Sequence, residues 1–384
     1  MKKLMIDGVF FQLASSGIAR VWVSVLTLWA QQNRFDMVLL DRGNAPEIDG
    51  VRTIPFPRWH APEAAADSAL LQQMCDHLGA DAFVSTYYTS PVSTPMALMV
   101  YDMIPELFDF DMRIKDWREK EIAIAFAQSY LCISNSTRND LIKLYPEISD
   151  ALVAVEYCGV DVETFRPRDQ TQVDAFRAAH SLDRPYFLFV GSRVQHKAYK
   201  NSDLFFDALG EMQSADFDVF CVGGETEIEA RILDSLPNGV RASRVSLSDD
   251  DLSLAYAGAA ALVYPSLYEG FGMPVIEAMA SGCPVITTSR GSLAEAAGDA
   301  ALLIDGTSVP EMVTALQGVL SPDTRATLRE KGLAHAAKFE WQPMADKMAQ
   351  QIDVAIRARD TKATTAFFAE WTRLRSLMAD VDHI

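Results

Sequence analysis

Short runs rich in Val, Ile, Leu and Phe recur along this chain, and longer segments with helical periodicity separate them. The runs are residues 36–40, 82–85, 97–101, 186–190, 217–222, 261–264 and 284–287. Continuous apolar strands of this kind are typical of parallel sheets that helices cover on both faces. The sequence therefore predicts an α/β protein made of two doubly wound domains.

The length of the chain also favours two domains. A chain of 384 residues exceeds what one core commonly holds, and domains of roughly 150–200 residues are expected. Proline and a charged run at 165–170 mark the joint, so we expect domains at 1–167 and 168–345. A helical tail is expected at 346–384. Each domain would present the carboxyl ends of its strands, the usual ligand side, to a shared cleft.

The net charge limits the possible partners. Lys and Arg number 34 against 52 Asp and Glu, which gives a formal charge of −18. A chain this acidic repels a phosphate backbone, so nucleic acid is not expected as a partner. A negatively charged substrate must instead be held by a few local cations and backbone N–H groups.

Five scattered cysteines without C-x-x-C spacing are typical of small buried side chains in a reducing compartment. They are Cys75, Cys132, Cys158, Cys221 and Cys283. The apolar start before Asp7 is too short for the core of a secretion signal. Residues 17–30 are too few to span a bilayer, which needs about 20. We expect a cytoplasmic protein in which 17–30 forms a buried helix; membrane contact by that helix is the alternative.

The segment 265–284 says most about chemistry. A strand that ends at Tyr264 runs into a turn with two glycines. Pro274 suits the first position of a helix, and Gly282 suits its end. The glycines let an anion approach the free N–H groups at the start of the helix, so this loop can receive a diphosphate.

Two carboxylates flank the glycine loop. Glu269 lies within it, and Glu277 lies about one turn into the helix, near the positive end, where a carboxylate stays ionised. This pair suits a ligand that carries phosphates at one end and hydroxyls at the other. A purely structural turn, with Glu277 complementing the helix dipole, is the alternative.

The segment resembles the signature of the retaining glycosyltransferases of family 4, also called glycosyltransferase group 1. The matching pattern is Pro-Ser-x-x-Glu-Gly-Phe-Gly-x-Pro-x-x-Glu-Ala-Met-Ala-x-Gly-x-Pro-Val. The resemblance implies the GT-B fold, two Rossmann-like domains facing a central cleft, with the acceptor on the first domain and the nucleotide sugar on the second. By that resemblance Glu269 contacts the transferred hexose and Glu277 the nucleotide ribose. Gly270, Phe271 and Gly272 would lie along the donor.

Cations follow the first strand of the second domain, in the stretch 190–201. A leaving nucleoside diphosphate gains charge as the glycosidic bond breaks, so fixed cations aimed at it lower the barrier. The family pattern of Gly-x-Arg followed by Lys-Asn resembles this stretch and selects Arg193 and Lys200, with Ser192 beside them at the donor. Lys197 is the alternative lysine, and a solvated basic turn is the structural alternative.

The first half resembles the family more loosely. Gly17 follows the first strand at the start of the long helix and is expected to let the chain approach the donor phosphate. Residues 100–106 resemble the family's His-Asp-x-x-Pro-Glu stretch, with Tyr101 in place of the histidine. The histidine's role then falls to Tyr101 or Asp102. Asp102 is the acceptor-side candidate, as base or hydroxyl orienter, and helix capping is its alternative.

Three further segments carry weaker signals. Residues 245–252 resemble the family's nucleobase loop, yet their three aspartates are expected to be a charge run at a helix start. Residues 291–295 resemble a stretch that lines the phosphate side. Apolar residues at helical spacing between 367 and 378 predict core packing, with an oligomer or membrane-proximal contact as the alternative.

These residues predict retaining transfer of a hexose, mannose or glucose, from a nucleotide diphosphate sugar to a glycan or lipid-linked glycan in surface polysaccharide assembly. GDP-mannose or UDP-glucose is the expected donor, with no other cofactor. No metal is expected, since Arg193, Lys200 and the helix start can neutralise the leaving charge. The expected location is cytoplasmic, with peripheral contact at the inner face of the membrane as an option. The rivals are a nucleotide-sugar epimerase of the same architecture and a non-catalytic two-domain sugar-binding protein.

Overall fold

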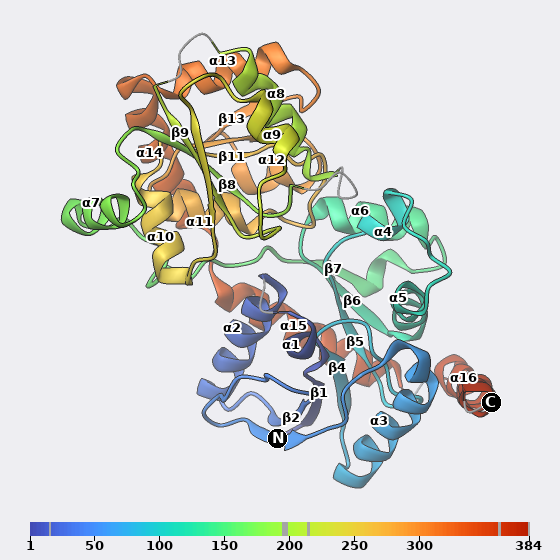
Figure 1. The fold of residues 1–384 in the computed structure, drawn as a ribbon. Coiled ribbons are helices and arrows are strands. Elements are labelled where there is room, and N and C mark those ends of the chain that lie inside the picture. The colour runs from blue at the N-terminus through green and yellow to red at the C-terminus, as the bar shows by residue number, and fades with distance from the viewer. Residues whose placement is uncertain (15–16, 194–198, 213–215, 360–361, 383–384) are drawn as a thin grey trace. The chain divides into compact units, whose positions relative to one another are not determined.

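A computed structural model describes residues 1–14, 17–193, 199–212, 216–359 and 362–382. The chain divides into two compact units (Figure 1). Unit 1 comprises Met1–Gly159 and Trp341–Ile384, and unit 2 comprises Val160–Glu340. The first boundary precedes the expected one at residue 167, because the backbone N–H of Val160 already donates to Phe339 O of unit 2 at 3.1 Å. The chain returns to unit 1 at Trp341, five residues before the expected tail at 346.

The strands of unit 1 are parallel to their neighbours. They are β1 Lys3–Asp7, β2 Asp36–Asp41, β3 Arg52–Pro55, β4 Ala82–Ser85, β5 Ala97–Val100, β6 Ser129–Cys132 and β7 Val153–Val155. A four-stranded sheet has the order β3-β2-β1-β4 and a three-stranded sheet the order β5-β6-β7. A bridge between Phe83 and Met96 links them. The strand order reverses where β1 lies between β2 and β4, and such switch points are where open α/β sheets bind ligands.

Helices cover both faces of this sheet. They are α1 Val9–Leu13, α2 Gly17–Gln31, α3 Ala64–Leu78, α4 Ile104–Leu107, α5 Lys115–Phe126, α6 Asn135–Leu144, α15 Trp341–Ala358 and α16 Lys362–Asp382, with 3-10 turns at Ala61–Glu63 and Asp150–Leu152. Side chains of α3, α5 and α6 share one core with the strands. On the other face α15 packs along α2 (Figure 1), and Trp29 Nε1 donates to Ala345 O at 3.0 Å. Trp22 and Trp29 are fully buried, which confirms the buried helix predicted at 17–30.

The apolar stripe near the end of the chain has two parts. Phe368 and Trp371 pack against Phe126, with ring centroids 5.7 and 5.9 Å away, so core packing is confirmed for this part. Leu374, Leu377 and Met378 of the same helix are exposed.

No helix among the described residues combines the length and the apolar character that crossing a bilayer requires.

A buried cluster of charges lies beneath the switch point of unit 1. Arg42 Nε donates to Asp7 Oδ1 at 2.6 Å, and its two terminal nitrogens donate to Asp67 at 2.7 and 2.8 Å. Asp7 also accepts a hydrogen bond of 2.5 Å from Thr89. Burial raises the pKa of Asp67 to about 6, although the hydrogen bonds from Arg42 oppose this. The guanidinium thus holds two carboxylates that would otherwise repel each other.

Unit 2 contains a six-stranded parallel sheet in the order β10-β9-β8-β11-β12-β13. Its strands are β8 Tyr186–Val190, β9 Asp218–Val222, β10 Arg241–Val245, β11 Ala261–Tyr264, β12 Val285–Thr288 and β13 Leu302–Ile304. The strands predicted in both halves are therefore confirmed, with shifts of a residue at some ends. The order reverses at β8, between β9 and β11, so the ligand side of this unit lies at the carboxyl ends of β8 and β11.

The helices of unit 2 form two layers. They are α7 Gln170–Ala179, α8 Ser202–Gly210, α9 Ala230–Ser235, α10 Asp249–Gly258, α11 Met273–Ala280, α12 Ser292–Ala297, α13 Val309–Val319 and α14 Pro322–Ala336. Helices α8, α9 and α13 share a core with one face of the sheet (Figure 1). On the other face, Tyr186 of β8 donates to Ala255 O of α10 at 2.6 Å, and Phe176 of α7 meets Phe220 of β9. The sheet is thus covered on both sides, as the apolar strands predicted.

The five cysteines are buried and free, as predicted. Burial raises the pKa of Cys75 and Cys283 to about 12 and that of Cys221 to about 11. These thiols therefore stay protonated and behave as small apolar side chains near neutral pH.

Candidate active site

The glycine loop joins β11 to α11 at the switch point of unit 2. Helix α11 begins at Met273, so Pro274 occupies its second position and not the first. Gly272 precedes the helix with a φ of +102°, and a Cβ there would lie 2.8 Å from Leu293 Cδ2. Glycine is required here both by its backbone conformation and by the packing.

The carboxyl end of α11 is closed by a Schellman motif. Cys283 N donates to Ala278 O at 2.8 Å, and Gly282 N donates to Met279 O at 3.0 Å. Gly282 has a φ of +76°, which suits this cap. The helix end predicted at Gly282 is therefore confirmed, and both ends of this eight-residue helix are fixed by glycines.

Glu269 is held by two side chains, Lys200 from the residues just before α8 and Tyr264 from the end of β11. Lys200 Nζ donates to Glu269 Oε1 at 2.7 Å, and the hydroxyl of Tyr264 donates to the same oxygen at 2.9 Å. The Glu269 residue is 9% exposed. Burial, together with the charge of Glu269, raises the pKa of Tyr264 well above its usual value, so the phenol stays protonated as a donor. The structure thus brings together Glu269 and Lys200, two residues predicted from separate motifs.

Glu277 lies on the buried side of α11. Its residue is 1% exposed, and its Oε2 accepts a hydrogen bond of 3.3 Å from the hydroxyl of Tyr256 on α10. A buried carboxylate near a helix start is stabilised by the helix dipole. Its predicted contact with a ribose stays a prediction.

Arg193 has a different setting from Lys200. The residue is 1% exposed, and its guanidinium donates to three backbone carbonyls, those of Gly191, Gly223 and Glu225, at 2.9 to 3.2 Å. These carbonyls belong to the segments that follow β8 and β9. In the described structure Arg193 therefore ties two strand ends together, and its predicted contact with a diphosphate stays a prediction.

Sequence reasoning missed Glu225. Its carboxylate accepts hydrogen bonds from the hydroxyl of Ser192 and from Arg193 N, the latter at 2.7 Å. Burial opposes ionisation, but these hydrogen bonds prevail and lower the pKa of Glu225. The signal was the glycine pair before it: Gly224 has a φ of +67°, and a Cβ there would lie 2.3 Å from Gly191 O. Two strand ends that meet this closely place the residue after the pair beside Ser192.

Two more residues missed from the sequence hold the glycine loop. Ser292 Oγ donates to Glu269 O at 2.6 Å. Asn201 Nδ2 donates to Pro265 O at 3.0 Å and to Gly306 O at 2.8 Å. Asn201 belongs to the Lys-Asn pair and Ser292 to residues 291–295, two stretches that resemble the family. Their contacts show that both residues position the backbone of the glycine loop.

The other predicted donor residues lie in or near the loop. Phe271 is buried, and its ring meets Phe339 edge-on at a centroid distance of 5.6 Å, so this side chain packs in the core of unit 2. Gly270 lies between Glu269 and Phe271.

Ser248 caps α10 by accepting from Asp251 N at 3.1 Å, which confirms the aspartates there as a helix-start run.

The predicted residues of unit 1 have local partners. Asp102 Oδ1 accepts from Ile104 N at 2.9 Å, so its carboxylate satisfies the first N–H of α4 from one residue before the N-cap, Met103. Tyr101 is buried, and its hydroxyl accepts a hydrogen bond of 2.5 Å from Trp22 Nε1. Gly17 is the first residue of α2. The helix-capping alternative for Asp102 is thus observed, and its acceptor-side role stays a prediction.

Some predicted positions lie outside the described residues. Lys197 falls in the undescribed stretch 194–198, so the choice between Lys197 and Lys200 rests on the contacts of Lys200 alone.

Comparison with known proteins shows what part of the chain is similar to a known family. Residues 184–321 match the family described as glycosyl transferases group 1. O-antigen chain mannosyltransferase B of Escherichia coli is 27% identical over 223 residues, which cover 56% of this chain and 58% of that protein. D-inositol 3-phosphate glycosyltransferase of Frankia alni is 33% identical over 248 residues, covering 59% of this chain and 58% of the relative. The chain spans about half the length of the curated relatives it matches.

Solved structures resemble the fold over most of its length. Sucrose-phosphate synthase of Thermosynechococcus elongatus has a TM-score of 0.74 at 18% identity, and the match covers 93% of this chain and 100% of the synthase chain. HepE of Anabaena in complex with UDP-glucose has a TM-score of 0.72 at 15% identity, covering 92% and 100%. These likenesses confirm the GT-B fold class. The match over residues 184–321 includes the glycine loop, and it agrees with the family resemblance that the glycine-loop signature indicated.

Proposed function

We propose that this protein transfers a hexose, with retention at the anomeric carbon, from a nucleotide diphosphate sugar to a saccharide hydroxyl in surface polysaccharide assembly. One observation carries the proposal. Glu269 is fixed by Lys200 and Tyr264 next to a glycine-bounded helix start, at the switch point of a parallel sheet. Such a site offers a carboxylate to sugar hydroxyls and N–H groups to a diphosphate within one short segment.

In the proposed reaction the bond between the anomeric carbon and the diphosphate oxygen breaks, and the acceptor oxygen bonds to the same face of that carbon. The departing diphosphate takes the acceptor's proton. Glu269 orients the hexose, Glu277 the ribose, and Lys200 with Arg193 offsets the charge that develops on the diphosphate. We assign no metal to this step, and Asp102 is proposed to orient the acceptor hydroxyl.

GDP-mannose and UDP-glucose are the proposed donors. A relative is named a mannosyltransferase, and a structure of similar fold was solved in complex with UDP-glucose. A donor at about 100 times its Kd should stabilise the protein by ~2.7 kcal/mol, so one of the two should raise the melting temperature in a thermal-shift assay. Mannose 1-phosphate and glucose 1-phosphate, which lack the nucleoside, serve as controls and should give smaller shifts. Shifts absent for every nucleotide sugar would contradict the proposal.

Two rivals are separated by one assay. A transferase releases nucleoside diphosphate only as acceptor is consumed, whereas an epimerase converts the donor with no acceptor. A sugar-binding protein would bind a sugar and turn over neither substrate. The carboxylate and lysine paired inside unit 2 favour the transferase, because a binding protein has no need for a cation beside a leaving group.

We also propose a peripheral contact with the inner face of the membrane. Leu374, Leu377 and Met378 of α16 are exposed together on unit 1, and such apolar groups favour an interface. The full chain should sediment with zwitterionic phosphatidylcholine vesicles, which do not repel its acidic surface, and Leu377→Lys should weaken this. Leu233→Lys, at an exposed leucine of unit 2, is the matched control. If Leu377→Lys leaves the sedimentation with vesicles unchanged, this face of α16 is not the membrane contact.

A further inference from the structure

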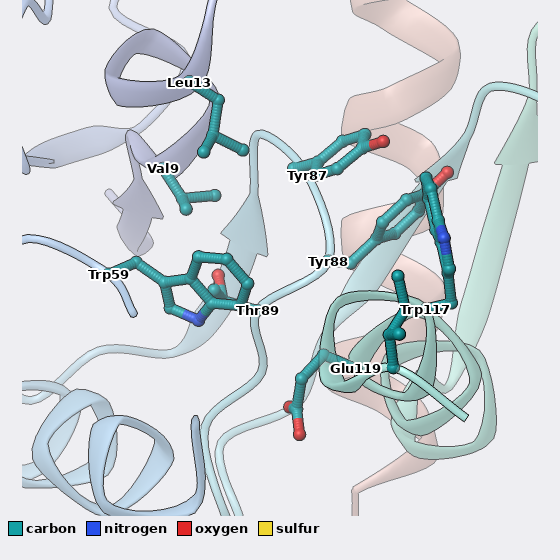
Figure 2. Close-up of a pocket in the computed structure, with 9 residues that line it drawn as sticks. Val9, Leu13, Trp59, Tyr87, Tyr88, Thr89, Trp117 and Glu119 are labelled. Carbon is teal, nitrogen blue, oxygen red and sulfur yellow. The ribbon is translucent and has the colours of Figure 1, made fainter. Parts of the chain in front are cut away.

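A pocket opens at the switch point of unit 1. It encloses about 180 Å³ and lies beside the segments that follow β1 and β4 (Figure 2). Val9 and Leu13 of α1 form one side, and Tyr87, Tyr88 and Thr89, just beyond β4, form another. The carboxyl ends of β1 and β4 are the position at which an open α/β sheet binds its ligand. None of the motifs that pointed to donor binding includes these residues.

Two tryptophans complete the walls, and each is held in place. Trp59 enters from the loop after β3 (Figure 2), where its backbone exchanges two hydrogen bonds with the side chain of Gln12, at 2.8 and 3.0 Å. Trp117 of α5 meets Phe110 edge-on at 5.6 Å. Both indoles are partly exposed. Large apolar rings left partly open to solvent in a concave site mark a place where a ligand is bound.

The side of the pocket formed by Tyr87 and Tyr88, its aromatic floor, is held by contacts with the residues behind it. The ring of Tyr88 lies under Lys120 Nζ, 5.5 Å from the ring centroid. That ammonium is buried and donates to Asp102 O at 2.9 Å and to Glu106 at 2.7 Å. Tyr87 contacts Tyr88 with ring centroids 4.0 Å apart. A floor fixed in this way is formed before a ligand arrives, which lowers the cost of binding.

Two polar side chains at the pocket, Thr89 and Glu119, are already engaged with the protein. Thr89 Oγ1 donates to Asp7 at 2.5 Å. Glu119 accepts from Arg375 at 3.3 and 3.4 Å. At the mouth, Leu13 is 45% exposed and Ile114 is 46% exposed. The surface offered to a ligand is therefore mainly carbon, and the hydroxyls of a sugar ring would lose water there without matching partners.

We propose that this pocket binds a hydrocarbon group, the alkyl or aryl aglycon of the acceptor. The inference rests on the proposed function, because it names the class of acceptor that unit 1 would hold. A cavity of about 180 Å³ accommodates one aromatic ring or a chain of about six carbons, on the scale of apolar cavities that take benzene. The acceptor's sugar hydroxyls would then remain outside, where water and polar groups are available.

The test compares two acceptor analogues that differ only in their apolar part. Binding of n-hexyl β-D-glucopyranoside and methyl β-D-glucopyranoside to the full chain is measured by calorimetry and by tryptophan fluorescence. The hexyl compound should bind about tenfold more tightly or better, since methylene groups leave water for a carbon-lined site. Trp59→Ala and Trp117→Ala should each remove most of this preference. Trp59→Phe should keep it, and His60→Ala, at the exposed neighbour of Trp59, should leave it unchanged.

The possible results separate this inference from the proposed function. Equal binding of the two glucosides, or a hexyl preference that survives both tryptophan replacements, overturns the inference. If the two glucosides bind with equal affinity and this binding depends on Trp59, the pocket binds a sugar ring, and the inference of a hydrocarbon site is also overturned. Neither result touches donor binding, which the thermal-shift assay measures on its own. The hexyl preference could depend on the tryptophans while no acceptor causes release of nucleoside diphosphate. That result would contradict the proposed transfer reaction and still support the hydrocarbon site.

Discussion

Replacing Glu269 by glutamine should lower kcat by about 100-fold or more while the protein remains folded. Glutamine keeps the shape of the side chain and an oxygen for Lys200 and Tyr264, so the loop should stay in place. What is lost is the charge that strengthens hydrogen bonds to the sugar and favours the developing positive charge at the anomeric carbon. The measurement is acceptor-dependent release of nucleoside diphosphate at saturating donor.

The partner of Glu269 supplies the second arm of this experiment. Lys200→Met should also reduce kcat, and the double variant should lose much less than the product of the two single effects, because the two groups contact each other. Glu211→Ala removes an exposed carboxylate just beyond α8 and serves as the control. Full activity in Glu269→Gln would remove this residue from the site.

The largest effect on stability should follow from Arg42→Met. This change leaves the fully buried Asp7 and the largely buried Asp67 without the cation that now contacts both. Removing one partner of a buried charge cluster typically costs about 3–5 kcal/mol, because the remaining charges are left uncompensated. We expect unit 1 to unfold at a distinctly lower urea concentration, as followed by tryptophan fluorescence.

A surface ion pair in the same unit offers a matched control. Arg113 contacts Asp111 at 2.8 Å, but both side chains are largely in solvent. Arg113→Met therefore removes a pair of the same chemistry without leaving a buried charge, and the urea transition should not move measurably. Equal transitions for Arg42→Met and the wild type would show that the buried cluster does not stabilise the fold.

The sequence predicted the parts of the site that lie within one short segment. Gly272, Glu269 and Glu277 share one strand, loop and helix, where backbone conformation and helix position follow from local residue choice. Lys200 was selected from a separate motif, and it meets Glu269 because β8 and β11 are neighbours in the sheet. The α/β class was readable because apolar strands recurred between helices.

What escaped prediction depends on contacts between distant segments. Glu225 reaches Ser192 only because β9 lies beside β8. Trp59 and Trp117 share a pocket although two strands, β4 and β5, and two α-helices, α3 and α4, separate them in the chain. Burial was equally hidden: Arg193 was predicted as a cation directed at the diphosphate, and the sequence did not reveal that its guanidinium donates to backbone carbonyls. Periodicity tells which face of an element is apolar, not which residues meet across the sheet.

Unit 1 is assembled from both ends of the chain, and this has a consequence for synthesis on the ribosome. The indole of Trp29 and the hydroxyl of Ser129 donate to backbone oxygens of α15, which is translated only after all of unit 2. Unit 2 is continuous and can fold as soon as residue 340 emerges. The nascent first 159 residues lack α15, so one face of their sheet stays only partly covered until then, and the unit whose synthesis begins first is completed last.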